Sequence, residues 1–321
     1  MQISLLLLPN TLPSSLFCLQ DVLAIAGLMQ AKQPWSIHTV STDGAAVTAF
    51  QGRPLAADAA LAAVPYSDMV LLPSRMLDQQ YSNAGPQVTD WLRQQADGGA
   101  RIASVCTGAF ALAETGLLDG LPATTHWLYA AQFRRRFPAV RLQPERALVD
   151  NGALLTAGAG MAWQDLLLTL LADHLSPAQL LQLRQMFLLQ GHPHGQQPYI
   201  GLASAGHQDA RVQQAQACLA DHLADDNALA QAMQLAGLAP RTFQRRFRQA
   251  TGYTAVQYLQ QLRIEKAKAL LLSGNLPVEQ VGFAAGYGDG SFFRRLFRRH
   301  TGLSPAAYRQ LYQQAGGQGA E

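Results

Sequence analysis

The chain has 321 residues, of which 49% are hydrophobic and 14% charged, so it has material for two cores and is not a disordered protein. The apolar run Ile3–Leu8 is far shorter than the roughly 20 residues of a membrane-spanning helix, and three widely spaced cysteines exclude a disulfide scaffold and fit a reducing compartment, so we expect a cytoplasmic protein. The net charge of +3 is unevenly distributed: Leu238–Arg309 holds 12 Lys and Arg against 3 Asp and Glu, whereas the remainder holds 12 basic and 18 acidic residues. A basic module on an acidic body is typical of a polyanion-binding domain, although a solvated basic surface gives the same count.

The first 175 residues alternate between strand-like and helix-like patterns. Apolar runs of strand length occur at Ile3–Leu8, Met69–Leu72 and Arg101–Val105, and helical patterns at Leu16–Met29, Val88–Ala96 and Ala109–Thr115. This alternation predicts an α/β domain with a mostly parallel sheet. A leucine-rich helical hairpin follows, Trp163–His174 and then Pro177–Gln190.

Residues 191–209 lose all apolar periodicity and are rich in Gly, Pro, His, Gln and Ser. We expect them to link an α/β domain, residues 1–190, to a helical domain, residues 210–312, which a flexible tail follows at 313–321. His192 and His194 lie two residues apart in this segment, but no Cys or carboxylate cluster accompanies them. We therefore expect no metal and no cofactor.

The C-terminal part repeats itself at an offset of 50 residues. Seven residues between 241 and 258 recur identically in the second copy, against roughly one expected by chance. They are Phe243, Arg245, Phe247, Arg248, Thr251, Gly252 and Tyr258, which recur as Phe293, Arg295, Phe297, Arg298, Thr301, Gly302 and Tyr308. A long amphipathic helix, Val256–Leu271, separates the copies.

Each copy has the plan of a helix-turn-helix unit. A short apolar helix, Ala228–Leu235 or Val278–Ala284, meets a turn with Gly237 or Gly286, and a second helix follows. Pro240 suits the first turn of one second helix, and Asp289 suits the N-cap of the other.

The second helices have two faces at helical spacing. We assign the paired phenylalanines to the core, and we expect Arg241 with Arg245, and Ser291 with Arg295, to face a DNA major groove, flanked by Arg294, Arg298 and Arg299. The alternative is a surface helix with arginine pairs and no ligand, which the duplication and the local charge disfavour.

The residues Leu219–Tyr312 resemble the DNA-binding domain of AraC/XylS-type regulators. The runs APRTFQRRFRQATG (Ala239–Gly252) and GYGDGSFFRRLFRRHTGLSPAAYR (Gly286–Arg309) follow that family's signature. The resemblance implies that the two second helices enter adjacent major-groove segments on one face of DNA. It also implies base-reading positions at Arg241, Gln244 and Arg245, and at Gly290, Ser291, Arg294 and Arg295; we add Arg248, Arg298 and Arg299 as DNA-binding residues. Two departures are Ala239, where the family has a capping Ser, and Gly290, which has no side chain for readout.

The runs SVCTGAFALAETGLLDG (Ser104–Gly120) and TTHW (Thr124–Trp127) resemble the GlxA-like subgroup of these regulators. That resemblance implies a PfpI-like, class I glutamine amidotransferase-like domain with a flavodoxin-like α/β sandwich fold. In the enzymes of that superfamily the equivalent of Cys106 is a nucleophile on a strand-to-helix elbow.

Cys106 allows three interpretations: a small residue in a tight turn, a residue of an effector pocket, or a catalytic nucleophile. A helix N-terminus can lower a thiol pKa, and His126 is a candidate base. However, Thr107 stands where the proteases have His, and Ser14 and Ser15 stand where related hydrolases place an acid. We therefore expect no enzyme, and we place Cys106, Thr107 and His126 at an effector pocket and Trp127 in the core.

The sequence thus predicts a transcriptional regulator. The expected partners are double-stranded promoter DNA, a small-molecule effector, a second copy of the chain and RNA polymerase. One rival interpretation is a cysteine-dependent amidase or peptidase that carries a DNA-binding domain, and another is an α/β domain that serves only for dimerisation.

Overall fold

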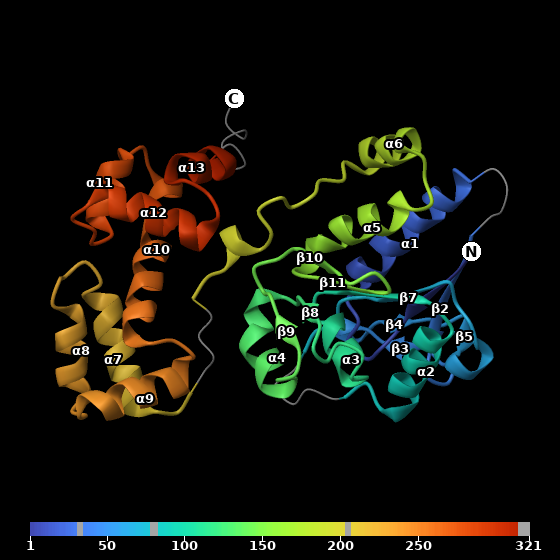
Figure 1. Cartoon of the computed structure of the whole chain (residues 1–321), viewed down its shortest axis with the longest axis horizontal. Helices are drawn as coiled ribbons and strands as arrows, with labels where there is room; N and C mark the ends of the chain where they lie inside the picture. The colour runs from blue at the N-terminus through green and yellow to red at the C-terminus, as the bar shows by residue number, and fades with distance from the viewer. Residues whose placement is uncertain (31–34, 78–82, 203–206, 314–321) are drawn as a thin grey trace. The chain divides into compact units, whose positions relative to one another are not determined.

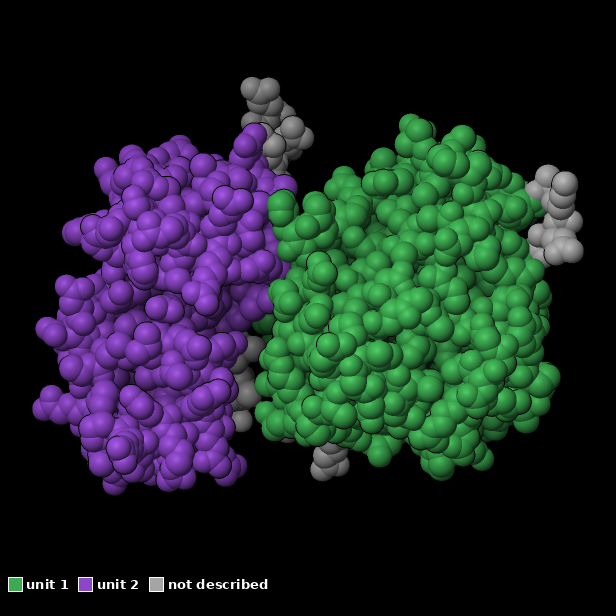
Figure 2. Space-filling model, in the orientation of Figure 1, with its two compact units in different colours: residues 1–196 green, residues 197–321 purple. Residues whose placement is uncertain are grey.

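The computed structural model describes residues 1–30, 35–77, 83–202 and 207–313. The chain divides into two compact units, Met1–Gln196 and Gln197–Glu321, which Figure 2 colours separately. Of the expected tail, residues 314–321 lie outside the described residues. No helix within the described ranges is long and apolar enough to cross a membrane.

A seven-stranded sheet forms the centre of the first unit, in the order β10-β11-β7-β6-β1-β2-β5. All neighbouring pairs are parallel except β10 with β11. The strands are β1 Gln2–Leu6, β2 Ser36–Ser41, β5 Ala59–Ala60, β6 Met69–Leu72, β7 Arg101–Val105, β10 Leu148–Asp150 and β11 Leu154–Ala157. Two small pairs lie outside it: β3 Val47–Thr48 with β4 Pro54–Leu55, and β8 Pro122–Ala123 with β9 Arg141–Leu142.

Helices cover both faces of this sheet (Figure 1). On one face lie α1 Pro13–Leu28, α5 Trp163–Ala172 and α6 Pro177–Phe187, and on the other α2 Pro86–Asp97, α3 Gly108–Glu114 and α4 Ala130–Arg136. Short 3₁₀ turns occur at Phe50–Gly52, Leu61–Ala63, Trp127–Tyr129 and Gly160–Ala162. Because both faces are covered, the central strands are buried runs rather than alternating ones. The flavodoxin-like α/β fold that the sequence predicts is confirmed.

The second unit is built of helices, apart from the short turn η5 Gln197–Tyr199. Its helices are α7 Ala210–Asp221, α8 Ala228–Ala236, α9 Pro240–Thr251, α10 Ala255–Ser273, α11 Val278–Ala284, α12 Gly290–Thr301 and α13 Pro305–Gln313. The long helix α10 joins two groups: α7, α8 and α9 pack at its first half, and α11, α12 and α13 at its second (Figure 1). The predicted double helix-turn-helix domain is therefore confirmed.

Local sequence explains where these helices begin and turn. Thr254 and Gln257 form a capping box at the start of α10, and Asp289 caps α12 as predicted, accepting hydrogen bonds from the backbone N–H groups of Ser291 and Phe292. In the second unit's first turn Gly237 takes a left-handed φ of 59°, and in the second turn Gly286 has φ 87°. A Cβ on Gly286 would lie 2.8 Å from the Cα of Ala224, so a side chain does not fit there.

Candidate functional site

The helix α9 presents a polar face beside a buried apolar one. Phe243 and Phe247 are buried in the core that α7, α8 and α10 share, as predicted. The exposed side carries all four of the residues expected at DNA on this helix: Arg241, Gln244, Arg245 and Arg248. The helix is thus anchored on one side and free on the other.

The helix α12 repeats this arrangement. Phe293 and Phe297 are buried, and the exposed residues are Ser291, Arg294, Arg295, Arg298 and Arg299, with Gly290 half-buried at the first position. Arg294 differs from the others because its Nη1 lies 2.8 Å from the Oε1 of Glu279 on α11. Both side chains of this pair are exposed, so the pair is weak.

Within the described part of the chain, the guanidinium groups of the remaining arginines on these faces make no ion pair and no hydrogen bond; these are Arg241, Arg245, Arg248, Arg295, Arg298 and Arg299. Unpaired guanidinium groups on two equivalent helices form a surface that suits an anionic ligand.

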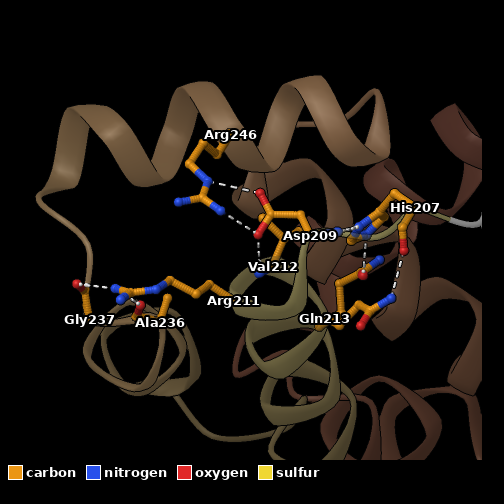
Figure 3. Close-up of polar contacts among 9 residues, drawn as sticks. His207, Asp209, Arg211, Val212, Gln213, Ala236, Gly237 and Arg246 are labelled. Carbon is orange, nitrogen blue, oxygen red and sulfur yellow. Dashed lines mark hydrogen bonds and ion pairs between the residues drawn. The ribbon is translucent and has the colours of Figure 1, made fainter.

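Two residues that the sequence analysis missed hold the first helix-turn-helix of the second unit in place (Figure 3). Arg246, on the inner side of α9, pairs with Asp209, the N-cap of α7, at 2.7 and 2.8 Å. Arg211 donates to the carbonyls of Ala236 and Gly237 at the helix-turn-helix turn. The repeat could have pointed to Arg246, because this charged residue stands where the second copy has the apolar Leu296.

The elbow of the first unit lies where β7 ends and α3 begins. Cys106 has a left-handed φ of 58°, and its backbone N–H donates to the carbonyl of Ala157 at 2.8 Å. Two residues later, a Cβ on Gly108 would lie 2.5 Å from the carbonyl oxygen of Leu72. The backbone around Cys106 is therefore strained and tightly packed, as in a nucleophile elbow.

The electrostatics of the elbow do not favour a thiolate. Cys106 is only 5% exposed, and burial raises the pKa of its thiol despite hydrogen bonds from Thr107 and Ser74. The helix N-terminus, which could lower this pKa, therefore does not decide it, because the loss of hydration outweighs the N–H groups. Burial by the surrounding layers could not be read from the local sequence.

The polar neighbours of the elbow are hydroxyl groups. Thr107 accepts a hydrogen bond from the backbone N–H of Arg75 at 3.0 Å and donates to the carbonyl of the same residue, so its side chain fastens the neighbouring loop. Ser15 accepts from the backbone N–H of Ser74 at 2.9 Å. In the described ranges, no carboxylate hydrogen-bonds to Cys106, Thr107 or Ser15.

The loop with His126 lies against the elbow. Thr125 Oγ1 donates to the carbonyl of Cys106 at 2.8 Å, and His126 Nδ1 accepts from the backbone N–H of Leu128 at 3.1 Å. Burial lowers the pKa of His126, so its imidazole is neutral near pH 7 and carries its proton on Nε2. Trp127 is half-buried, so its placement in the core is only partly right.

The sequence analysis also missed Gln196, which is 3% exposed. Its Nε2 lies within hydrogen-bond distance of four acceptors: the carbonyls of Thr125, Pro144 and Arg146 and the hydroxyl of Thr124, at 2.8 to 3.2 Å. Its Oε1 accepts from the backbone N–H of Trp127. The last residue of the first unit is therefore fastened to the loop that carries His126.

The described residues contain no group of three or more His, Cys, Asp and Glu side chains that could hold a metal ion. His192 is paired instead with Asp165, with 2.6 Å between Nδ1 and Oδ2, and the hydrogen bond to this carboxylate raises the pKa of His192.

Comparisons with known proteins agree with these two units. The model of the DJ-1/PfpI family matches residues 17–173, and that of a helix-turn-helix domain matches residues 232–311. The chain is 27% identical over 309 residues to the HTH-type transcriptional regulator CdhR of Pseudomonas aeruginosa, covering 92% of this chain and 91% of that protein. It is 27% identical over 242 residues to the regulator GlxA of Rhizobium meliloti, covering 71% and 73%.

Solved structures show the likeness of the fold. An AraC family transcriptional regulator from Pseudomonas putida matches with a TM-score of 0.52 and 21% identity, covering 58% of this chain and 98% of that one. DJ-1beta of Drosophila melanogaster matches with a TM-score of 0.50 and 21% identity, covering 59% and 98%. With a helix-turn-helix repeat in one unit and a DJ-1/PfpI sheet in the other, the chain combines a PfpI-like domain with an AraC-type DNA-binding domain and is a transcriptional regulator, similar to HTH-type regulators such as CdhR and GlxA.

Proposed function

We propose that α9 and α12 read two adjacent major-groove segments of a promoter on one face of the DNA. The observation that carries this proposal is the equivalence of two exposed faces, Arg241, Gln244, Arg245 and Arg248 on α9 and Ser291, Arg294, Arg295 and Arg298 on α12. Arg245 and Arg295 occupy the same position in the repeat, and Arg donates bidentately to guanine O6 and N7 in the major groove.

The other residues have supporting roles in this proposal. Arg299 contacts phosphate, which positions the protein without specifying sequence. Gly290, with no side chain, lets the start of α12 approach the backbone of the DNA closely.

The test is binding of the full chain to duplex fragments from its own promoters. Affinity should fall steeply with added salt, because neutralised phosphates release counterions. Arg245→Ala and Arg295→Ala should reduce the preference for cognate over scrambled DNA, whereas Arg299→Ala should weaken both alike. Equal losses on cognate and scrambled DNA for all three variants would overturn these roles.

For the first unit we propose ligand sensing rather than catalysis. A cleft at the carboxyl ends of parallel strands is the usual ligand position in such sheets. We place such a site beside Cys106, whose thiol stays protonated, and His126, whose neutral imidazole offers an Nε2–H donor. A nucleophile needs a thiolate and a base that hydrogen-bonds to it, and within the described residues His126 makes no hydrogen bond to Cys106.

Gln196 supports a link from this cleft to DNA binding. It holds the loop beside Cys106, and the next residue, Gln197, begins the second unit and donates to the carbonyl of Arg299 on α12 at 2.5 Å. A small molecule that binds the loop can favour one arrangement of this connection only if it prefers that arrangement.

Three variants of the full chain test the cleft. Cys106→Ser should leave DNA affinity near that of the wild type, whereas Cys106→Trp should change it by filling the cleft. Cys18→Trp, the same substitution on α1 of the first unit, is the control for bulk. If Cys106→Trp leaves folding and DNA affinity unchanged, the cleft has no role in sensing. If the wild type hydrolyses a small amide or ester and Cys106→Ser does not, the amidase or peptidase interpretation is correct.

The remaining partners follow from regulation of transcription. We propose RNA polymerase and a second copy of the chain as partners, and the cytoplasm as the location, because a bacterial-type promoter regulator acts where the DNA and the polymerase are. Sedimentation of the full chain with and without DNA tests the second copy.

A further inference from the structure

Residues 207–213, at the start of α7, make contacts that the proposed DNA contacts do not use. Asp209 begins α7, and its carboxylate accepts a hydrogen bond from the backbone N–H of Val212 as the helix N-cap. The same carboxylate accepts from Arg246 Nε at 2.8 Å and from Nη2 at 2.7 Å, a bidentate pair (Figure 3). This pair holds the pKa of Asp209 below its usual value.

Arg246 lies on α9 between Arg245, which is exposed, and Phe247, which is buried. Its half-buried guanidinium group points toward α7 rather than to the exposed face, as Figure 3 shows. A bidentate pair fixes both the distance and the plane of the guanidinium group, and therefore resists rotation of the helix that carries it.

The equivalent position on α12 is held differently. Leu296 replaces Arg246 there, and it is buried among the apolar side chains of the second half of the unit. The two recognition helices thus share their exposed face but not the contact that fixes their orientation.

The neighbouring residues make the start of α7 a firm support. Arg211 donates to the carbonyl of Gly237 at 2.9 Å and to that of Ala236 at 3.3 Å, which fixes the turn before α9. His207 Nε2 lies 2.8 Å from Gln216 Oε1, and Gln213 donates to the carbonyl of His207 at 2.6 Å (Figure 3). One short stretch therefore holds the turn and the recognition helix together.

We propose that Asp209 is a positioning residue for DNA recognition: through Arg246 it sets the orientation of α9, and so the base preference of the first half of the operator, without touching DNA. The inference rests on the proposed function of α9. A small rotation of a helix moves the tip of a long side chain such as Arg245 well out of bidentate geometry. The effect belongs to one half of the operator, because α12 is fixed by Leu296 and its neighbours.

The experiment is a selection of bound sequences from a pool of randomised DNA duplexes by the full chain. Arg245→Ala and Arg295→Ala first assign the base pairs that α9 and α12 read. Asp209→Asn then keeps a good N-cap residue but loses the paired charge. Arg246→Lys breaks the bidentate geometry from the other side and leaves the cap intact. Asp289→Asn is the control, because this cap in the second half accepts hydrogen bonds from the backbone N–H groups of Ser291 and Phe292.

We expect Asp209→Asn and Arg246→Lys each to reduce discrimination about three- to tenfold at the base pairs assigned to α9, and to leave those of α12 unchanged. Asp289→Asn should leave the α9 base pairs as in the wild type. Circular dichroism checks that each variant is folded. If Asp209→Asn does not fold, the base preference of Arg246→Lys alone tests the inference.

Two results would overturn the inference: unchanged preference at the α9 base pairs in Arg246→Lys, or an equal loss of affinity in both halves. Failure of the proposed function is distinct, because Arg245→Ala would then change no base preference at all.

Discussion

The two helix-turn-helix units carry nearly the same recognition surface on different supports. In both, a threonine hydroxyl at the end of the recognition helix donates to the carbonyl one turn earlier, Thr251 to Phe247 and Thr301 to Phe297. In the first helix-turn-helix, α9 is held by Asp209 and starts at Ala239 without a side-chain cap, whereas in the second helix-turn-helix α12 starts at Asp289, which caps it.

The two recognition helices can be compared position by position, because each residue of α9 has a counterpart 50 residues later on α12. A repeated structural contact would be expected wherever the two helices pack alike, yet Arg246 and Leu296 differ in chemistry. The exposed arginines at 245 and 295 are the same. The phenylalanine core and the exposed Arg245 and Arg248 therefore recur as a set although the contact at Arg246 does not, and the recurrence of exposed, unpaired arginines favours a common anionic ligand.

The largest expected effect concerns the buried phenylalanines that the two helix-turn-helix units share. Phe247→Ala and Phe297→Ala should each lower the local free energy of unfolding by about 3–5 kcal/mol, because both rings are fully buried. Hydrogen exchange of peptides from α9 and α12 in the full chain reads each unit separately. Phe283 is 76% exposed, so Phe283→Ala should change the local free energy of unfolding by less than about 0.5 kcal/mol. A loss in only one unit would show that the two cores are not equivalent.

The sequence was sufficient to predict the elements with a regular pattern. Buried strands such as β6 and β7 are apolar runs, and the recognition helices repeat with their phenylalanines, so fold class and both units were predicted. The strand β2 was missed because Ser36, His38 and Thr39 give it no apolar run, and it becomes a strand only by pairing with β1.

The site was less predictable because its contacts join distant residues. Gln196 lies 72 residues from Thr124, and Asp209 lies 37 from Arg246, in a segment whose composition predicts only a linker. The order of Ser104, Cys106 and Thr107 predicts an elbow. Whether the pKa of the cysteine thiol is raised or lowered depends on burial, which the fold decides.

The next effect tests the contact that differs between the units. Leu296→Ala should lower the local free energy of unfolding of the second helix-turn-helix by about 2–4 kcal/mol, since it removes a buried side chain from a packed core. Arg246→Ala should lower the local free energy of unfolding of the first helix-turn-helix by much less. The same exchange measurement decides, and equal losses would mean that the ion pair and the apolar contact support their helices alike.

A smaller effect concerns the helix starts. Ala239→Ser should raise the stability of α9 by about 1 kcal/mol, because a serine hydroxyl can accept a hydrogen bond from an N–H group that α9 leaves uncapped. Asp289→Ala should lower the stability of α12. Thermal unfolding followed by circular dichroism measures both, and a destabilising Ala239→Ser would show that the cap position is already satisfied in another way.

The smallest effect concerns Arg294, whose counterpart on α9 is the uncharged Gln244. Glu279→Gln should raise DNA affinity about two- to threefold at low salt, because it removes a negative charge and frees the guanidinium group. The gain should vanish at high salt. Lower affinity at low salt would indicate that Glu279 holds Arg294 in its binding orientation.

Footprinting of guanine N7 on an operator bound by the full chain tests the central claim most directly. We expect protection in two major-groove segments about 10 base pairs apart on one face of the DNA. Arg245→Ala should abolish protection in one segment only, and Arg295→Ala in the other only. Protection of a single segment, or loss of the same guanines in both variants, would contradict recognition by two equivalent helices.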